Sequence, residues 1–367
     1  MPQKELDQAV QARVEKWVRS DIQSLKAYQV ADASGLIKLD AMENPYTWEE
    51  ELKQQWLAEM QQQSLNRYPD PSGKSVVAGL KEVFGIDQRY DVLLGNGSDE
   101  LIQIIIAALA ADNLTVLSPE PSFVMYEMIA KFLRVNYVGV PLGNDFTLDL
   151  TAMLDAIEAH QPGVVFLAQP NNPTGNLFGE EKVRRIIEAS PGLVVVDEAY
   201  LAFAESNALT LLADYSNLVV MRTLSKVGLA GLRLGFLVGH PGWINELNKV
   251  RLPYNINQLT QVSAQFALLH YNQLAEQITQ LVVDRERLFE SLQQLEGITV
   301  WPSQANFLLF RSLTVPAKAL HQALIKEGVL IKCLDGAHPL LTGCLRVTVG
   351  APAENEAFLK VLSALLS

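Results

Sequence analysis

The sequence is short of basic charge, of cysteine and of long apolar runs. Lysine and arginine number 29 against 41 acidic residues, which leaves a net charge of −12 and no basic cluster. Such a surface repels phosphate backbones, so nucleic-acid binding is disfavoured and an anionic substrate would need a local positive pocket. The two cysteines, Cys333 and Cys344, are too few for a disulfide framework and suit a reducing compartment.

Other absences exclude further classes of protein. The longest charge-free apolar run, 101–111, is far shorter than the ~18 residues that a membrane span needs. The polar N-terminal segment lacks the apolar core of a signal peptide. The five histidines show no HExxH spacing, and no GxSxG nucleophile elbow occurs. We therefore expect a cytoplasmic protein that has no metal ion and no membrane or nucleic-acid partner.

The chain has ample material for a buried core and an α/β fold. Hydrophobic residues make up 49% of its 367 residues, and the length predicts about two domains. Short β-branched runs alternate with helical or turn-rich segments in the middle of the chain, as is typical of strands buried on both faces of a mostly parallel sheet. The seven runs are 92–94, 114–117, 135–140, 164–168, 193–196, 218–221 and 234–238.

The remaining segments predict a smaller α+β domain built from both termini. Apolar spacing over 10–25 predicts an arm or helix packed on a core. Further helices are expected at 49–63, 261–270, 278–295 and 317–326, and strands at 306–310 and 345–349. We expect an N-terminal arm and part of the small domain at 1–62, a large domain at 63–260, and the C-terminal small domain at 261–367.

Ligands of an open α/β sheet bind beyond the carboxyl ends of its strands, so the residues after each run are informative. The first run is followed by Gly95-Asn-Gly-Ser-Asp-Glu100, where glycines and a helix N-terminus would let the backbone approach an anion. Glu100 stands where a dinucleotide fingerprint has its third glycine, which disfavours a nicotinamide site. By itself the motif is equally well read as a plain strand-to-helix turn.

Three later junctions carry further polar groups. Asn172-Pro-Thr-Gly175 holds an amide in a rigid turn, and Asp197-Glu-Ala-Tyr200 places an acid at a strand end. Such an acid is often only a helix cap, but beside a pyridine nitrogen it keeps that nitrogen protonated. Lys226 follows the sixth run; most lysines are solvated, but one in apolar surroundings can form a Schiff base. Ser225 and Arg233 add groups that bind phosphate.

This ordered set of motifs resembles the fold-type I aminotransferases. Within them it is most similar to the histidinol-phosphate aminotransferases of the class-II subgroup, through segments 38–46, 67–71 and 344–350. The resemblance covers about 36–350 and implies pyridoxal 5′-phosphate bound in the large domain. The implied reaction is transamination between L-histidinol phosphate and 2-oxoglutarate, giving imidazole acetol phosphate and glutamate. It would run in the reverse direction in histidine biosynthesis.

The resemblance also implies roles for the motif residues. The catalytic residues would be Lys226, which bonds the cofactor and moves the proton, Asp197 on the pyridine nitrogen, and Tyr200, which shares the phenolic oxygen with Asn172. Phe123 would stack on the ring. The cofactor phosphate would be held by Gly97, Ser98, Asp99, Ser225 and Arg233, and by Tyr68 of a neighbouring subunit in a homodimer with shared active sites.

Substrate binding is implied at the C-terminal end of the chain. Arg346 occupies the position of the arginine that clamps a substrate carboxylate, and it would hold the phosphate of histidinol phosphate in the other half-reaction. Tyr28, Asn172 and Lys332 would assist. Lys332 stands where many relatives have arginine, and Met42 where many have asparagine. The spacing from Lys226 to Arg233 is one residue shorter than in some relatives.

Three alternatives stay open at this point. An aromatic-amino-acid aminotransferase would use the same residues, and a phosphothreonine decarboxylase would differ in which bond of the substrate stands perpendicular to the ring. A regulator with an aminotransferase-like domain behind a DNA-binding leader is disfavoured, because few residues precede Lys38 and Lys226 is intact.

Overall fold

The computed structural model describes residues 3–25, 27, 30–111 and 113–366. Two compact units divide the chain, Met1–Ser34 and Gly35–Ser367. The first contains α1 (Gln3–Trp17) and α2 (Ser20–Gln23), neither of which has a buried residue. The helix expected here is confirmed, whereas its packing on a core stays a prediction.

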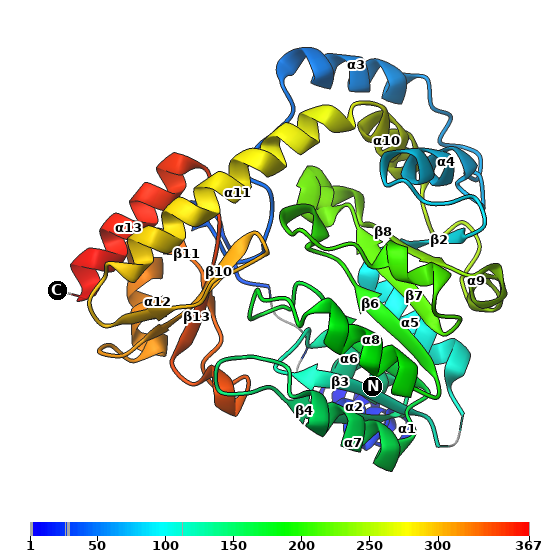
Figure 1. The fold of residues 1–367 in the computed structure, drawn as a ribbon, viewed down its shortest axis with the longest axis horizontal. Coiled ribbons are helices and arrows are strands. Elements are labelled where there is room, and N and C mark those ends of the chain that lie inside the picture. The colour runs from blue at the N-terminus through cyan, green and yellow to red at the C-terminus, as the bar shows by residue number, and fades with distance from the viewer. Residues whose placement is uncertain (1–2, 26, 28–29, 112, 367) are drawn as a thin grey trace. The chain divides into compact units, whose positions relative to one another are not determined.

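A seven-stranded sheet forms the centre of the second unit (Figure 1). Its strand order is β2-β8-β7-β6-β5-β3-β4, and β8 runs antiparallel to both of its neighbours while the other pairs are parallel. The strands are β2 (Asp91–Asn96), β3 (Thr115–Glu120), β4 (Asn136–Pro141), β5 (Val164–Ala168), β6 (Leu193–Asp197), β7 (Leu218–Thr223) and β8 (Leu234–Gly239). All seven predicted runs are confirmed as strands of one mostly parallel sheet.

The strands are apolar throughout because helices cover both faces of the sheet. Side chains alternate between the faces of a strand, so in β6 Leu193 and Val195 join one buried cluster, whereas Val194 and Val196 join the other. One face is covered by α5 (Ser98–Leu109), α6 (Met125–Phe132) and α9 (Pro241–Asn248), and the other by α7 (Leu150–His160) and α8 (Glu180–Ala189).

A second, antiparallel sheet is built mainly from the C-terminal part of the chain, in the order β12-β13-β10-β9. Its strands are β9 (Ile298–Val300), β10 (Phe307–Ser312), β12 (Lys332–Cys333) and β13 (Cys344–Thr348), and helices α12 (Ala317–Lys326) and α13 (Pro352–Leu366) accompany it. Beside it, β1 (Ile37–Lys38) pairs with β11 (Val329–Leu330). The expected strands at 306–310 and 345–349 are confirmed. The two- and three-residue strands escaped prediction because they are too short to show a period.

The long helix α11 (Tyr271–Gln293) extends from the helices near the seven-stranded sheet to those near the antiparallel sheet. Figure 1 shows it running from beside α10 (Gln258–Leu269) to α13. The helices α3 (Glu50–Gln61) and α4 (Lys74–Val83) pack on α10. No helix within the described ranges has both the length and the apolarity to cross a membrane.

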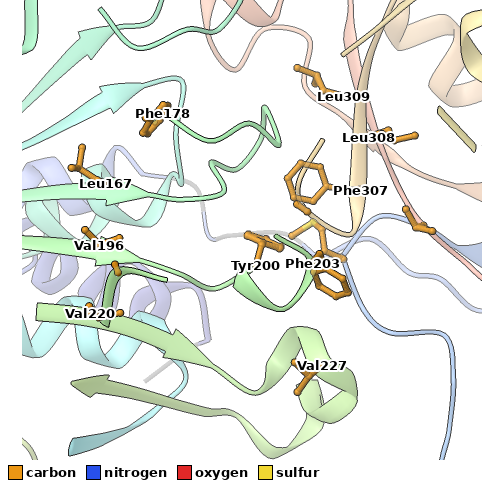
Figure 2. Close-up of a cluster of buried hydrophobic side chains, with 14 of the residues drawn as sticks. Leu167, Phe178, Val196, Tyr200, Phe203, Val220, Val227, Phe307, Leu308 and Leu309 are labelled. Atoms are coloured by element: carbon orange, nitrogen blue, oxygen red, sulfur yellow. The ribbon is translucent and has the colours of Figure 1, made fainter. Parts of the chain in front are cut away.

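Short helical turns complete the second unit, and several lie where the two sheets meet. They are η1 (Leu201–Phe203), η2 (Ala208–Ala213), η4 (Ala230–Leu232), η5 (Pro339–Leu341) and the π-helical turn η3 (Ser225–Leu229). Figure 2 shows Tyr200 and Phe203 beside Phe307 of β10, so that a buried apolar cluster joins the end of β6 to the second sheet.

Candidate active site

A cavity of about 110 Å³ lies at the carboxyl ends of the parallel strands. Nine of the residues expected from the sequence line it, and they come from five separate strand junctions. The lining consists of Met42, Ser98, Asp99, Phe123, Ala168, Pro170, Asn172, Asp197, Ala199, Tyr200, Thr223, Ser225, Lys226 and Arg233. The residues expected beyond the carboxyl ends of the strands therefore meet around one cavity at that edge of the sheet.

Lys226 is half-buried in the cavity wall, in the turn η3 that follows β7. Its Nζ donates a hydrogen bond of 3.4 Å to the carbonyl oxygen of Ala41 and lies 5.6 Å from the centre of the Tyr200 ring. Burial, and after it the positive charge of Arg346, lower the pKa of Lys226 to about 8. A lysine with this pKa keeps an appreciable fraction of neutral, nucleophilic amine near physiological pH.

Asp197 ends β6 and is buried, with 4% of its surface exposed. Its Oδ2 accepts a hydrogen bond of 2.6 Å from the Tyr126 hydroxyl, and its Oδ1 accepts one of 3.1 Å from the Ala199 N–H. Burial raises the pKa of Asp197 to about 6, while these two hydrogen bonds oppose the increase. Ionised Asp197 would be stabilised by a cationic ring N–H of a ligand, because such a partner offsets the desolvation of the carboxylate.

An anion cradle lies between β2 and α5. Gly97 precedes α5 with φ +81°, and a Cβ at this position would lie 2.7 Å from Nη2 of Arg233. Arg233 itself adopts a left-handed conformation with φ +50°, and its Nη2 lies 3.6 Å from Oδ2 of Asp99. Glycine thus allows the guanidinium to approach the N-terminus of α5, where free N–H groups favour a phosphate.

The acidic residue of this loop has a structural explanation. Oε2 of Glu100 accepts hydrogen bonds from the Asn96 N–H at 2.6 Å and from Nδ2 of Asn255 at 2.7 Å. It therefore closes the turn instead of facing a ligand. Ser225 is held on the other side of the cradle, where Oγ1 of Thr223 donates to Oγ of Ser225 at 2.9 Å.

A polar chain joins the cavity to the second sheet. Nδ2 of Asn172 donates to the Tyr200 hydroxyl at 3.2 Å, and Oδ1 of Asn172 accepts a short hydrogen bond from Nη1 of Arg346. Nη2 of Arg346 donates to the Asp40 carbonyl at 3.1 Å, and the guanidinium lies 5.2 Å from the centre of the Phe307 ring. Burial raises the pKa of Tyr200, and Arg346 opposes the increase. The arginine from β13 is thus brought next to a cavity-lining amide.

Two of the expected site residues, Tyr68 and Lys332, lie outside the cavity lining. Tyr68 is 80% exposed and stacks on Tyr254 with ring centres 4.4 Å apart. Lys332 is half-buried on β12, directly opposite Arg346 in the sheet. Tyr28 lies outside the described residues. Phe123 lies edge-on to Tyr126, with ring centres 5.6 Å apart.

Sequence reasoning gave no role to three residues at the cavity: Tyr126, Thr223 and Met42. Tyr126 lies three positions after Phe123, but no sequence pattern pairs its hydroxyl with Asp197. Thr223 is the last residue of β7, and a strand extended by two residues would have included it. Met42 reaches the cavity through a left-handed backbone with φ +54°, for which the sequence carries no signal. Within the described chain, no three histidine, cysteine or acidic residues cluster to hold a metal ion.

A parallel-sheet domain with a buried lysine, a buried acid and an anion cradle at one edge defines an enzyme of the fold-type I class. The chain belongs to the family of class I and II aminotransferases, whose sequence model matches residues 34–362. This family depends on pyridoxal 5′-phosphate.

The chain is also similar to individual proteins over nearly its full length. It is 57% identical to histidinol-phosphate aminotransferase 2 of Nitrosococcus oceani over 96% of this chain and 98% of the relative. It is 51% identical to the histidinol-phosphate aminotransferase of Chromobacterium violaceum over 95% and 98% of the two chains. The crystal structure of the Sinorhizobium meliloti histidinol-phosphate aminotransferase with pyridoxal-5′-phosphate shares the fold, with a TM-score of 0.84 and 24% identity over 95% and 97% of the chains.

The residues present fit pyridoxal phosphate on structural grounds. The cradle at Gly97 would be filled by any Cβ, the carboxylate of Asp197 is buried at the cavity floor, and the Lys226 amine is held in the wall. An anionic phosphate, a cationic ring nitrogen and an aldehyde are the complementary groups for these three features.

Proposed function

We propose that the protein catalyses transamination between L-histidinol phosphate and 2-oxoglutarate, giving imidazole acetol phosphate and glutamate, and that it works in the reverse direction in histidine biosynthesis. The relatives named histidinol-phosphate aminotransferase support this substrate, because they match almost the whole chain at 57% and 51% identity. The observation that carries the proposal is the buried arginine, Arg346, hydrogen-bonded to the cavity-lining Asn172. A guanidinium binds either a phosphate or a carboxylate through paired hydrogen bonds, so one residue serves both substrates.

The cofactor supplies an electron-accepting ring that stabilises the negative charge left when the substrate Cα loses its proton. Lys226 would hold the cofactor through its Nζ, and the same amine would take and return this proton. Asp197 keeps the ring nitrogen protonated, for which it must be ionised. Asn172 and Tyr200 donate hydrogen bonds to the phenolic oxygen, and the two are already in contact at 3.2 Å.

The remaining residues bind and orient. The cofactor phosphate is held at the N-terminus of α5 by Ser98, Asp99, Ser225 and Arg233, and Gly97 leaves the necessary space. Phe123 contacts the ring face. The small-sheet residues Arg346 and Lys332 bind the anionic end of the substrate, with Tyr28 assisting.

We extend the proposal to assembly, location and domain organisation. The exposed stack of Tyr68 on Tyr254 supports a homodimer in which Tyr68 reaches the phosphate of the other subunit's cofactor. Two unpaired cysteines support a cytoplasmic location. The large domain spans 63–260, and the small domain combines part of 1–62 with 261–367; the pairing of β1 with β11 supports this division.

The test of the proposed function is a half-reaction. The purified protein is loaded with pyridoxal phosphate and given L-histidinol phosphate without 2-oxoglutarate, and its visible absorption band is expected to disappear. If the band persists but disappears with phenylalanine or tyrosine, the protein is an aromatic aminotransferase. If phosphothreonine releases carbon dioxide, it is a decarboxylase. A protein that shows no band after loading contradicts the role of Lys226.

A matched pair of arginine variants tests the substrate site. Arg346→Gln is expected to weaken binding of both L-histidinol phosphate and glutamate by about 100-fold, because a buried charged hydrogen-bonding group is lost. Arg311→Gln is the control, since Arg311 lies on β10 of the same sheet and donates to the Leu340 carbonyl instead. Loss of affinity for only one of the two substrates in Arg346→Gln would contradict a shared anion site.

A further inference from the structure

The segment Leu39–Met42, which we call the strap, passes the cavity, and each of its carbonyl groups accepts a hydrogen bond. The Leu39 carbonyl accepts from the Thr348 N–H at 2.9 Å and the Asp40 carbonyl from Nη2 of Arg346 at 3.1 Å. The Ala41 carbonyl accepts from Nζ of Lys226 at 3.4 Å. The strap is therefore held by the two cations that the proposed reaction assigns to the substrate and the cofactor.

Neither cation can keep its strap contact unchanged during the proposed reaction. Nζ of Lys226 is needed for a covalent bond and for proton transfer, and the guanidinium of Arg346 is needed for an anion. Each of these tasks competes for a donor that now holds a strap carbonyl. The Asp40 and Ala41 carbonyls thus lose donors at the stage when the cavity wall must be best defined.

Two contacts at Met42 are independent of these cations. Nδ2 of Asn306 donates to the Met42 carbonyl at 3.0 Å, and the Met42 N–H donates to Oγ1 of Thr348 at 2.9 Å. Asn306 is 1% exposed and Thr348 3%, so water does not replace either partner. They hold Met42 at φ +54°, a left-handed conformation that is costly for a side chain such as methionine.

The backbone segments that carry Asn306 and Thr348 are also hydrogen-bonded to each other. The carbonyl of Asn306 accepts from the Val349 N–H at 2.9 Å, directly beside the pairing of Phe307 with Thr348. The two side chains thus belong to one rigid piece, formed by the start of β10 and the end of β13. Met42, 9% exposed, is placed on the cavity wall by this piece.

We propose that Asn306 is a positioning residue for the substrate: together with Thr348 it fixes Met42 on the cavity wall while Lys226 and Arg346 leave the strap. This inference rests on the proposed function. Without Asn306, the strap must be ordered each time that substrate binds, and this ordering reduces affinity for substrate. The cofactor cradle around Gly97 and Arg233 makes no contact with Asn306, so affinity for the cofactor is preserved.

The test combines amide hydrogen exchange with kinetics on the cofactor-loaded protein. In Asn306→Ala, the Met42 amide is expected to exchange about tenfold faster, the loss typical of one buried hydrogen bond, while the Leu39 amide, bonded to the Leu330 carbonyl, is unchanged. KM for both amino donors is expected to rise about tenfold, with kcat and the dissociation constant of pyridoxal phosphate within about twofold of the original values.

Further variants separate positioning from general stability. Thr348→Val removes the acceptor with little change of shape and is expected to reproduce the faster exchange, whereas Thr348→Ser retains it and restores the original behaviour. Asn355→Ala is the control, because Asn355 is another buried amide, bonded to Gly350 instead of the strap. Unchanged exchange at Met42 in Asn306→Ala and Thr348→Val would overturn the proposal, as would an equal loss of cofactor affinity.

The exchange measurement needs no substrate, which keeps the two hypotheses distinguishable. If the unmodified protein does not react with L-histidinol phosphate but Asn306→Ala loosens Met42 alone, the proposed function fails and the positioning of the strap stands. If the protein reacts and Asn306→Ala leaves exchange at Met42 unchanged, the proposed function stands and the positioning role of Asn306 fails.

Discussion

The hydroxyl group of Tyr126 favours the ionised form of Asp197, and Tyr126→Phe tests this directly. The hydroxyl donates a 2.6 Å hydrogen bond to Oδ2 of Asp197 inside a fully buried environment. Burial raises the pKa of Asp197 to about 6, and this hydrogen bond is the largest effect that opposes the increase. Removing it leaves a buried carboxylate with less support, so protonation becomes easier.

The magnitude follows from the strength of a hydrogen bond to a charged group, about 1.5–3 kcal/mol. At about 1.4 kcal/mol per pKa unit, the pKa of Asp197 rises by about 1–2 units, to about 7–8. The ionised carboxylate is the form that partners the protonated ring nitrogen. Affinity for pyridoxal phosphate is therefore expected to fall as pH decreases below about 8 in the variant, and only below about 6 in the original protein.

The assay is a fluorescence titration of the cofactor-free protein with pyridoxal phosphate between pH 5.5 and 9. Titration of the cofactor itself cancels in the ratio of the two dissociation constants. That ratio is expected to be near one at pH 9 and about 5- to 50-fold at pH 6. Tyr137→Phe is the control, since the Tyr137 hydroxyl contacts Oγ of Ser118 at 2.8 Å. A ratio for Tyr126→Phe that does not change with pH would refute the reasoning.

Three further predictions concern the cofactor-free fold, the cradle and the assembly. Lys226→Met is expected to stabilise the cofactor-free protein by up to about 3 kcal/mol at pH 7. The pKa of Lys226 is about 8 in the folded protein, below its ordinary value of 10.5. The original protein therefore gains stability as the pH rises from 8 to 10.5, and the difference between the two proteins in the free energy of unfolding by urea becomes smaller. Gly97→Ala is expected to weaken binding of pyridoxal phosphate but not of pyridoxal, because its Cβ would displace the Arg233 guanidinium. Gly179→Ala is the control: Gly179 also has a positive φ, but a Cβ there would have no atom within 4 Å, so this variant should bind both compounds normally. Mixing Tyr68→Ala with Lys226→Ala subunits is expected to give more activity than either variant alone, and no gain would contradict shared active sites.

The sheet and the polar residues that line the cavity were predictable for the same physical reason. A strand buried on both faces must be apolar along its whole length, so polar residues such as Asp197 and Lys226 mark its end. In a parallel sheet these ends meet at one edge. The sequence therefore indicates the edge of the sheet and the residues there at once, and nine of these residues line the cavity.

The residues that escaped prediction act through tertiary contacts that no local sequence pattern indicates. Asn306 and Thr348 contact Met42, more than 260 residues away in the chain, and the carbonyl of Met42 carries no sequence signal. Tyr126 is one aromatic among many until its hydroxyl is seen on Asp197. Local patterns identify groups that do chemistry, whereas the groups that orient them depend on tertiary contacts.

The cofactor-free site carries an electrostatic cost that its proposed ligand would reduce. Burial disfavours the charged forms of both Asp197 and Lys226, raising the pKa of the acid and lowering that of the amine. A ring N–H cation would offset the cost at Asp197, and covalent bonding would replace the buried ammonium of Lys226. The free energy that folding expends in burying these groups is thus partly recovered on binding. Cofactor binding is accordingly expected to stabilise the folded protein by more than its phosphate contacts alone would give, and in Lys226→Met that surplus should be smaller.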